Sequence, residues 1–285
     1  MKWTTGNRDN IEDLRGSTGG GGGLRMGGIG LGGLLLMLLL SWVTGVDFLS
    51  LLGGGGVDAP TTNVQPSAPP ADTTAAEEKA VDMVDAVMGD AQTVWQQLLG
   101  NRYRPTTAAL FRDAVPSACG FAESATGPFY CPADHKVYLD LGFFSELSSR
   151  FGAPGDFARA YVIAHELGHH VQSLLGTETQ VRRLQSSRPD QRNALSVALE
   201  LQADCYAGVW GYHAGQGSGR RVTLERGDVE SGLRAAAAIG DDRIQRMQRG
   251  RVAPESFTHG SSEQRVTWFR RGLDNGDVNA CDTFR

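Results

Sequence analysis

Residues 160–172 read AYVIAHELGHHVQ and carry the pattern H-E-x-x-H. His165 and His169 are four residues apart, so on a helix both imidazoles leave the same face one turn apart. Both nitrogens can then meet one zinc ion at about 2.0–2.1 Å. Glu166 lies at the edge of that face, where its carboxylate can reach a zinc-bound water rather than the ion. The stretch therefore predicts a zinc site on a helix.

The neighbours of the pattern support this interpretation, because most of them are apolar. They are Val162, Ile163, Leu167 and Val171. The alternative is a buried helix that happens to carry two histidines and a glutamate. Polar side chains in such an apolar run are costly without partners, so we favour the metal site.

A catalytic zinc site needs a third protein ligand and keeps one position open for water. The extended metzincin pattern is excluded, because Gln172 and Leu175 stand where it has glycine and histidine. Residues 198–208, ALELQADCYAG, predict a second helix with Glu200 and Asp204 on one face. One carboxylate can bind zinc while the other accepts a hydrogen bond from a ligand imidazole. We expect Glu200 to be the ligand and Asp204 its support; the reverse assignment and an ordinary polar helix face stay open.

Outside this pattern, apolar residues recur at helical spacing in several segments, and one β region lies between the first and the second of them. We expect helices over 77–98, 155–175, 192–212, 228–239 and 262–273, the first capped by Thr73 or Thr74. We expect strands within 108–115, 128–131 and 136–141. The fold class is therefore α+β, mainly helical, with a small β-sheet.

Residues 26–46 contain no charged side chain, and about 20 such residues span a bilayer as a helix. A cleaved signal peptide is the alternative, but its apolar part would be shorter and a cleavage site would follow. We assign residues 1–25 to a cytoplasmic segment, 26–46 to a transmembrane anchor, 47–76 to a flexible Gly/Pro-rich linker and 77–285 to the globular domain.

Basic residues predict the orientation of this anchor. Lys2, Arg8, Arg15 and Arg25 precede it, and the next basic residue is Lys79. Positive charge favours the cytoplasmic side. We expect a single-pass protein of a bacterial cell membrane, with its N-terminus in the cytoplasm and its domain outside.

The four cysteines all follow the predicted anchor, and an exported compartment favours disulfides. Cys119 and Cys131 flank a turn-rich segment of the β region, so we favour that pair and leave Cys205 with Cys281. The net charge of −5 and the isolated arginine pairs give no support for nucleic-acid binding.

Several stretches together resemble a bacterial family of membrane-anchored neutral zinc metallopeptidases, the YpfJ type. They are residues 10–16 (NIEDLRG), 127–132 (GPFYCP), 137–140 (VYLD), the HELGHHVQ block, 200–208 and 259–265 (HGSSEQR). The resemblance implies a zincin-like domain and a gluzincin-like site in which zinc is bound by His165, His169 and Glu200.

By the same resemblance, His259 is the candidate donor to the developing oxyanion, and it lies beside a glycine ahead of a predicted helix. A surface-loop histidine is the alternative. Glu166 would act as general base toward a zinc-activated water, and the substrate would be a protein or peptide. Residues 137–140 are a candidate edge strand for an extended substrate. Two other functions stay open: a non-catalytic zinc-containing binding or scaffold protein of the cell envelope, and a zinc amide hydrolase with a non-protein substrate.

Overall fold

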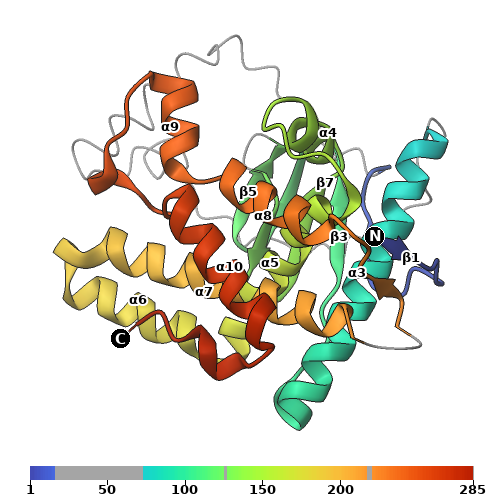
Figure 1. Cartoon of the computed structure of the whole chain (residues 1–285), viewed down its shortest axis with the longest axis horizontal. Helices are drawn as coiled ribbons and strands as arrows, with labels where there is room; N and C mark the ends of the chain where they lie inside the picture. Colours follow the sequence, from blue (N-terminus) through green and yellow to red (C-terminus); the bar gives the residue numbers. More distant parts are fainter. Residues whose placement is uncertain (17–72, 125–126, 217–219, 285) are drawn as a thin grey trace, which may run out of the picture. The chain divides into compact units, whose positions relative to one another are not determined.

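The computed structural model describes residues 1–16, 73–124, 127–216 and 220–284. These residues belong to one compact unit, in which helices cover a small sheet (Figure 1). None of the described helices is long and apolar enough to cross a bilayer. The predicted anchor at 26–46 and most of the predicted linker lie outside the described residues.

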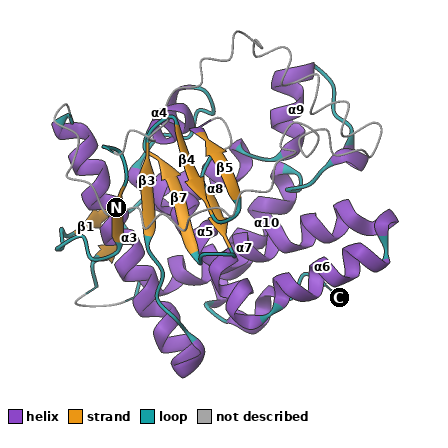
Figure 2. Cartoon of the chain, turned by 180° about the vertical axis from the view of Figure 1, so that it is seen from behind, coloured by secondary structure: helices purple, strands orange, loops and turns teal. Residues whose placement is uncertain are grey.

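The central sheet has four strands in the order β2-β3-β7-β6. Figure 2 shows two of them, β3 and β7, side by side. The strands are β2 (Ile11–Asp13), β3 (Ala108–Phe111), β7 (Lys136–Asp140) and β6 (Phe129–Cys131). The first three run parallel, and β6 is antiparallel to β7. Alternate side chains of β3 pack into two different hydrophobic clusters. Ala108 and Leu110 join the main helical core, whereas Ala109 and Phe111 join a smaller cluster with Val115 and Ala122.

The helices follow the predicted pattern, with three additions. Those predicted are α3 (Ala75–Leu99), α5 (Asp156–Leu175), α7 (Arg192–Ala214), α8 (Asp228–Ala238) and α10 (Ser262–Asn275). The additions are α4 (Gly142–Ser149), α6 (Thr177–Ser187) and α9 (Asp241–Arg249). Thr74 and Ser261 begin α3 and α10 with capping boxes, in which side chain and backbone satisfy each other reciprocally. The mainly helical α+β class is confirmed.

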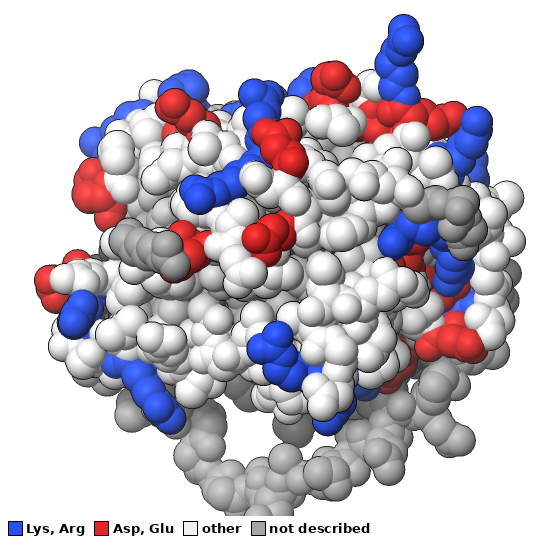
Figure 3. Space-filling model, turned by 60° about the horizontal axis from the view of Figure 1, so that its bottom comes forward, with Lys and Arg blue, Asp and Glu red and all other residues white. Residues whose placement is uncertain are grey.

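Shorter strands complete the fold. The first residues of β4 (Ala114–Ser117) fall within the strand region predicted at 108–115, whereas its hairpin partner β5 (Gly120–Glu123) is not predicted. Strand β1 (Lys2–Trp3) pairs with β8 (Val222–Thr223). Both favoured disulfides, Cys119–Cys131 and Cys205–Cys281, are present and confirm that pairing. On the face drawn in Figure 3, positive and negative side chains are interspersed.

The N-terminal residues are part of this unit rather than an appendage. Strand β2 forms one edge of the central sheet, and the side chain of Leu14 is buried in the smaller cluster. The side chain of Arg15 is fully buried and pairs with Asp13 at 2.7 Å and Glu78 at 2.9 Å. The domain therefore includes residues 1–16 in addition to the predicted range.

Candidate metal centre

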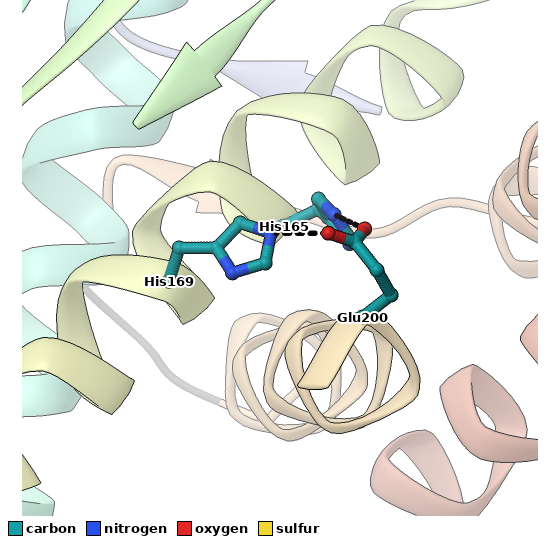
Figure 4. Close-up of side chains that lie close together, drawn as sticks. All are labelled: His165, His169 and Glu200. Atoms are coloured by element: carbon teal, nitrogen blue, oxygen red, sulfur yellow. Dashed lines mark hydrogen bonds and ion pairs between the residues drawn. The ribbon is translucent and has the colours of Figure 1, made fainter. Parts of the chain in front are cut away.

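Two histidines of α5 and one glutamate of α7 converge on a single point. His165, His169 and Glu200 each offer one ligand atom, and these atoms lie within 4.8 Å of one another. The Nε2 atom of His165 lies 3.2 Å from Glu200 Oε2, and that of His169 lies 3.5 Å from Glu200 Oε1. Figure 4 shows the three side chains pointing toward one another.

Close packing of α5 on α7 makes this convergence possible. Gly168 lies between the two histidines in the chain and faces α7. A Cβ atom at that position would come within 2.9 Å of the carbonyl oxygen of Ala203, closer than side chains are found in folded proteins. The glycine inside the H-E-x-x-H pattern therefore lets the backbones of the two ligand-bearing helices approach.

Asp204 fixes the orientation of His165. Its Oδ1 accepts a hydrogen bond of 2.8 Å from the Nδ1–H of His165, which leaves Nε2 free for a metal. Arg265 of α10 donates to both oxygens of Asp204, at 2.8 and 2.9 Å, and the hydroxyl of Tyr161 donates to Oδ1 as well. Burial would raise the pKa of Asp204, but Arg265 and His165 lower it below its ordinary value, so the carboxylate stays ionised.

Gln172 fixes the orientation of His169 in the same way. Its Oε1 accepts from the Nδ1–H of His169 at 2.8 Å. Its Nε2 donates to the carbonyl of Leu199 at 2.7 Å and to Gln202 at 3.1 Å, both on α7. Both ligand imidazoles are thus held in the tautomer that presents Nε2 toward Glu200.

The electrostatics of the site match a bound cation. Burial would lower the pKa of His165, but Asp204 and Glu200 raise it to about 10. Burial would likewise raise the pKa of Glu200, but the two histidines hold it well below its ordinary range. A cation displaces protons from such a site, because imidazole binds metals in its neutral form. Two imidazole nitrogens and one carboxylate, each supported from behind, form a donor set that fits zinc.

Glu166 lines a cavity of about 540 Å³ together with the three candidate ligands. Glu166 is only 7% exposed. Within the part of the chain that the structure describes, its carboxylate has no hydrogen bond or ion pair, whereas Glu200 is held by both histidines. The two glutamates therefore differ: Glu200 lies with the two histidines in the candidate metal set, and Glu166 lines the cavity beside it.

His259 lies in the loop before α10 and lines the same cavity. Its Nδ1 contacts Asp241 Oδ1 at 3.3 Å and Thr258 Oγ1 at 3.0 Å. The side chain of His259 is about half exposed, and the hydrogen bond that it donates to Asp241 raises its pKa above the ordinary value. Oδ2 of Asp241 also accepts from three successive backbone N–H groups of this loop, those of Thr258, His259 and Gly260.

The structure brings together every residue that the sequence singled out for the site, and it adds four. Sequence reasoning gave no role to Tyr161, Gln172, Asp241 or Arg265. Arg265 ends the HGSSEQR stretch at 259–265, but nothing in that local pattern indicates that it pairs with Asp204.

One expectation about substrate binding is wrong. Residues 137–140 were the candidate edge strand, but β7 lies between β3 and β6 inside the sheet. The edge strand on this side is β6, and Phe129 and Tyr130 of that strand line the cavity.

The H-E-x-x-H helix and a glutamate from a second helix together form a candidate two-histidine, one-glutamate metal site. Residues 1–284 match the family described as "Putative neutral zinc metallopeptidase". The chain belongs to this family.

Relatives match at high identity. The uncharacterized protein YpfJ of Escherichia coli strain K12 is 44% identical over 298 aligned residues, covering 100% of this chain and 99% of that protein. An uncharacterized protein of Mycobacterium tuberculosis strain H37Rv is 46% identical over 208 residues, covering 70% of this chain and 69% of that protein. No solved structure matches the chain.

Proposed function

We propose that this protein is a zinc-dependent peptidase in which His165, His169 and Glu200 bind the metal and Glu166 is the general base. The observation that carries the proposal is the contrast between the two glutamates. Glu200 is engaged by both ligand histidines, while Glu166 lines the same cavity and has no hydrogen bond or ion pair with another described residue. A purely structural metal site does not need a carboxylate in that position.

Each residue then has a defined part in hydrolysis. Zinc, when bound, would supply Lewis-acid polarisation of the scissile carbonyl and of the attacking water. The carboxylate of Glu166 takes a proton from that water and passes it to the leaving amine. Nδ1 of His259 faces the carboxylate of Asp241, so its Nε2 carries a hydrogen only in the protonated imidazolium, the form that the raised pKa favours. In that form Nε2–H can donate to the developing oxyanion. Asp204 and Gln172 hold the ligand imidazoles in place.

The location of the domain is part of this proposal. Two disulfides on the described chain favour an oxidising compartment outside the cytoplasm. Membrane attachment through residues 26–46 is supported by their composition. The substrate would be a protein or peptide of that compartment.

The test is zinc content and cleavage of casein or a peptide library by the full chain, beside Glu166→Gln. We expect stoichiometric zinc in both proteins and a loss of activity of about 10²–10⁴-fold or more in the variant. Glu146→Gln is the matched control, since Glu146 lines the same cavity but is about half exposed and pairs with Arg150; it should keep full activity. Retained cleavage in Glu166→Gln would exclude the proposed base, and absence of zinc in the wild type would exclude the metal centre.

A further inference from the structure

One side of the cavity is lined by large apolar side chains. We call this group the apolar wall; it consists of Phe143, Phe151, Val162, Ile239 and Ile244. These residues come from four places in the chain: α4, the loop after it, α5 and the α8–α9 region. Cavities that bind ligands combine such apolar surface with a few directed polar groups.

The inner end of the apolar wall adjoins the metal centre. Val162 is three residues before His165 and four before Glu166 on α5, so it lies on their face one turn away. The carbonyl of Ile239 accepts a hydrogen bond of 3.3 Å from Arg265, whose Nη2 lies 3.4 Å from His165 Nδ1. A side chain adjacent to the bond under attack would therefore meet these two residues.

The outer part of the wall is a joint surface of α9 and the chain after α4. Arg243 donates to the carbonyl of Phe151 at 2.9 Å, which ties Phe151 to the helix that carries Ile244. The ring of Phe143 lies against Gly127, where a Cβ atom would be 3.7 Å from it. The wall thus continues from the metal centre to the mouth of the cavity.

The five residues of the apolar wall carry no charge. The charged side chains at the outer margin of the wall pair with each other. The nearest charged lining residues from this part of the chain are Glu146 and Arg150, which pair with each other at 3.4 Å and are 55% and 54% exposed. The guanidinium of Arg150 lies 5.5 Å from the centre of the Phe151 ring. At this outer margin the described charged side chains therefore compensate each other, while the unpaired carboxylate of Glu166 lies at the inner end, beside the candidate metal centre.

Resting on the proposed function, we propose that the apolar wall is a specificity subsite. It accepts a large aliphatic or aromatic side chain next to the scissile bond, so the substrates are peptides carrying leucine, phenylalanine or a similar residue there. Burial of that side chain against the wall would favour it over a small or charged one.

A peptide library cleaved by the full chain, with products identified by mass spectrometry, gives the preferred residue on each side of the bond. A matched series of one cleaved peptide then carries Phe, Leu, Ala, Asp or Lys at the selective position. We expect kcat/KM for Phe or Leu to exceed that for Ala or Asp by about 10-fold or more. Equal rates across the series would overturn the subsite while leaving the peptidase intact.

Ile244→Arg places a positive charge on the wall and should shift preference toward the Asp peptide by about 10-fold or more relative to the Leu peptide. Met247→Arg is the control on the same helix, because Met247 is 48% exposed and does not line the cavity; it should keep the wild-type ranking. An unchanged ranking in folded Ile244→Arg, as judged by thermal unfolding, would count against the wall. If the wild type cleaves nothing in the library, it is the proposed peptidase function that fails.

Discussion

Asp241 organises the loop of His259 although it is 18 residues away in the chain. One of its oxygens accepts three backbone hydrogen bonds, and the other faces the imidazole of His259. Burial would raise the pKa of Asp241, but these hydrogen bonds lower it below the ordinary 3.8. The charged carboxylate is therefore the form that holds the loop.

Asp241→Asn should keep the shape of this contact and remove its charge. We expect the free energy of unfolding at neutral pH to fall by about 1–3 kcal/mol, because hydrogen bonds to a charged acceptor become neutral ones. Catalytic turnover should fall while zinc content stays unchanged, since no candidate ligand touches Asp241. Denaturant unfolding, metal analysis and peptide cleavage measure the three quantities.

The pH dependence of that difference follows from the two pKa shifts. The contribution of Asp241 is present above its unfolded pKa of 3.8 and lost as the pH falls through its lower folded pKa. The pKa of His259 is raised, so its contribution is present below 6.5 and lost as the pH rises through its folded pKa. The wild type should exceed Asp241→Asn most clearly between about pH 4 and 6.5. A difference that persists undiminished at pH 2 would contradict this role.

At this scale the sequence predicts residues that share a local pattern. The spacing in H-E-x-x-H and the Glu200–Asp204 pair follow from helix geometry alone. Asp241, Arg265 and Gln172 could not be assigned, because each acts on a partner that only the tertiary fold selects. Gln172 was noted only as the residue that excludes another class of site.

Helices α7 and α10 pack closely through glycines on both helices. A Cβ atom at Gly272 would lie 2.0 Å from the carbonyl oxygen of Cys205, and one at Gly208 would lie 2.1 Å from that of Phe269. Because α10 also carries Arg265, the distance between these helices sets the geometry of its bonds to Asp204.

Gly272→Ala should therefore force the two backbones apart. We expect a loss of about 1–3 kcal/mol or more in the free energy of unfolding, since the clash is with the main chain. Gly211→Ala is the control, because Gly211 lies on the face of α7 that carries Gly208. The atom nearest to a Cβ at Gly211 is at the end of the Leu273 side chain, which can move. Gly211→Ala should leave the free energy of unfolding nearly unchanged. Alanine favours a helix by about 1 kcal/mol over glycine, and this gain offsets the cost of moving the Leu273 side chain. Denaturant unfolding curves that are equal for the two variants would contradict the close-packing argument.

Elements with a sustained apolar period were predictable, and the short or polar ones were not. α5 and α7 were expected within two residues of their observed ends. α6 and α9 are short and each contains only two large apolar residues, so no apolar run marks them in the sequence. β2 has only three residues, and no pattern that short identifies a strand.

The whole molecule depends on residues 1–16. Arg8 pairs with Glu78 and Asp82 of α3 at 2.6 and 2.7 Å. The backbone of β2 pairs with β3 over three residues. Without this segment, Leu14 and the bonds of Arg15 are lost, and β3 becomes an unpaired edge.

A chain that lacks residues 1–16 should be less stable by roughly 3 kcal/mol or more, from lost apolar burial and buried ionic hydrogen bonds. A synthetic peptide of residues 1–16, added in excess, should restore part of the melting temperature. The same peptide with Leu14→Asp should not, because that side chain is buried in the smaller cluster. Unchanged stability of the shortened chain, measured by calorimetry, would show that the segment is dispensable.

The pairing of β2 with β3 also limits how the chain can thread through a bilayer. A helix that crosses once leaves its two flanking segments in different compartments. Residues 1–16 and 73–284 flank the apolar stretch at 26–46, yet they share one sheet. A molecule folded in this way keeps both flanks in one compartment, and an intervening stretch that entered the bilayer would have to leave by the leaflet it entered. The cytoplasmic N-terminus predicted from basic residues and an exported domain are therefore alternatives for any single folded molecule, because the paired strands β2 and β3 lie on one side of a bilayer.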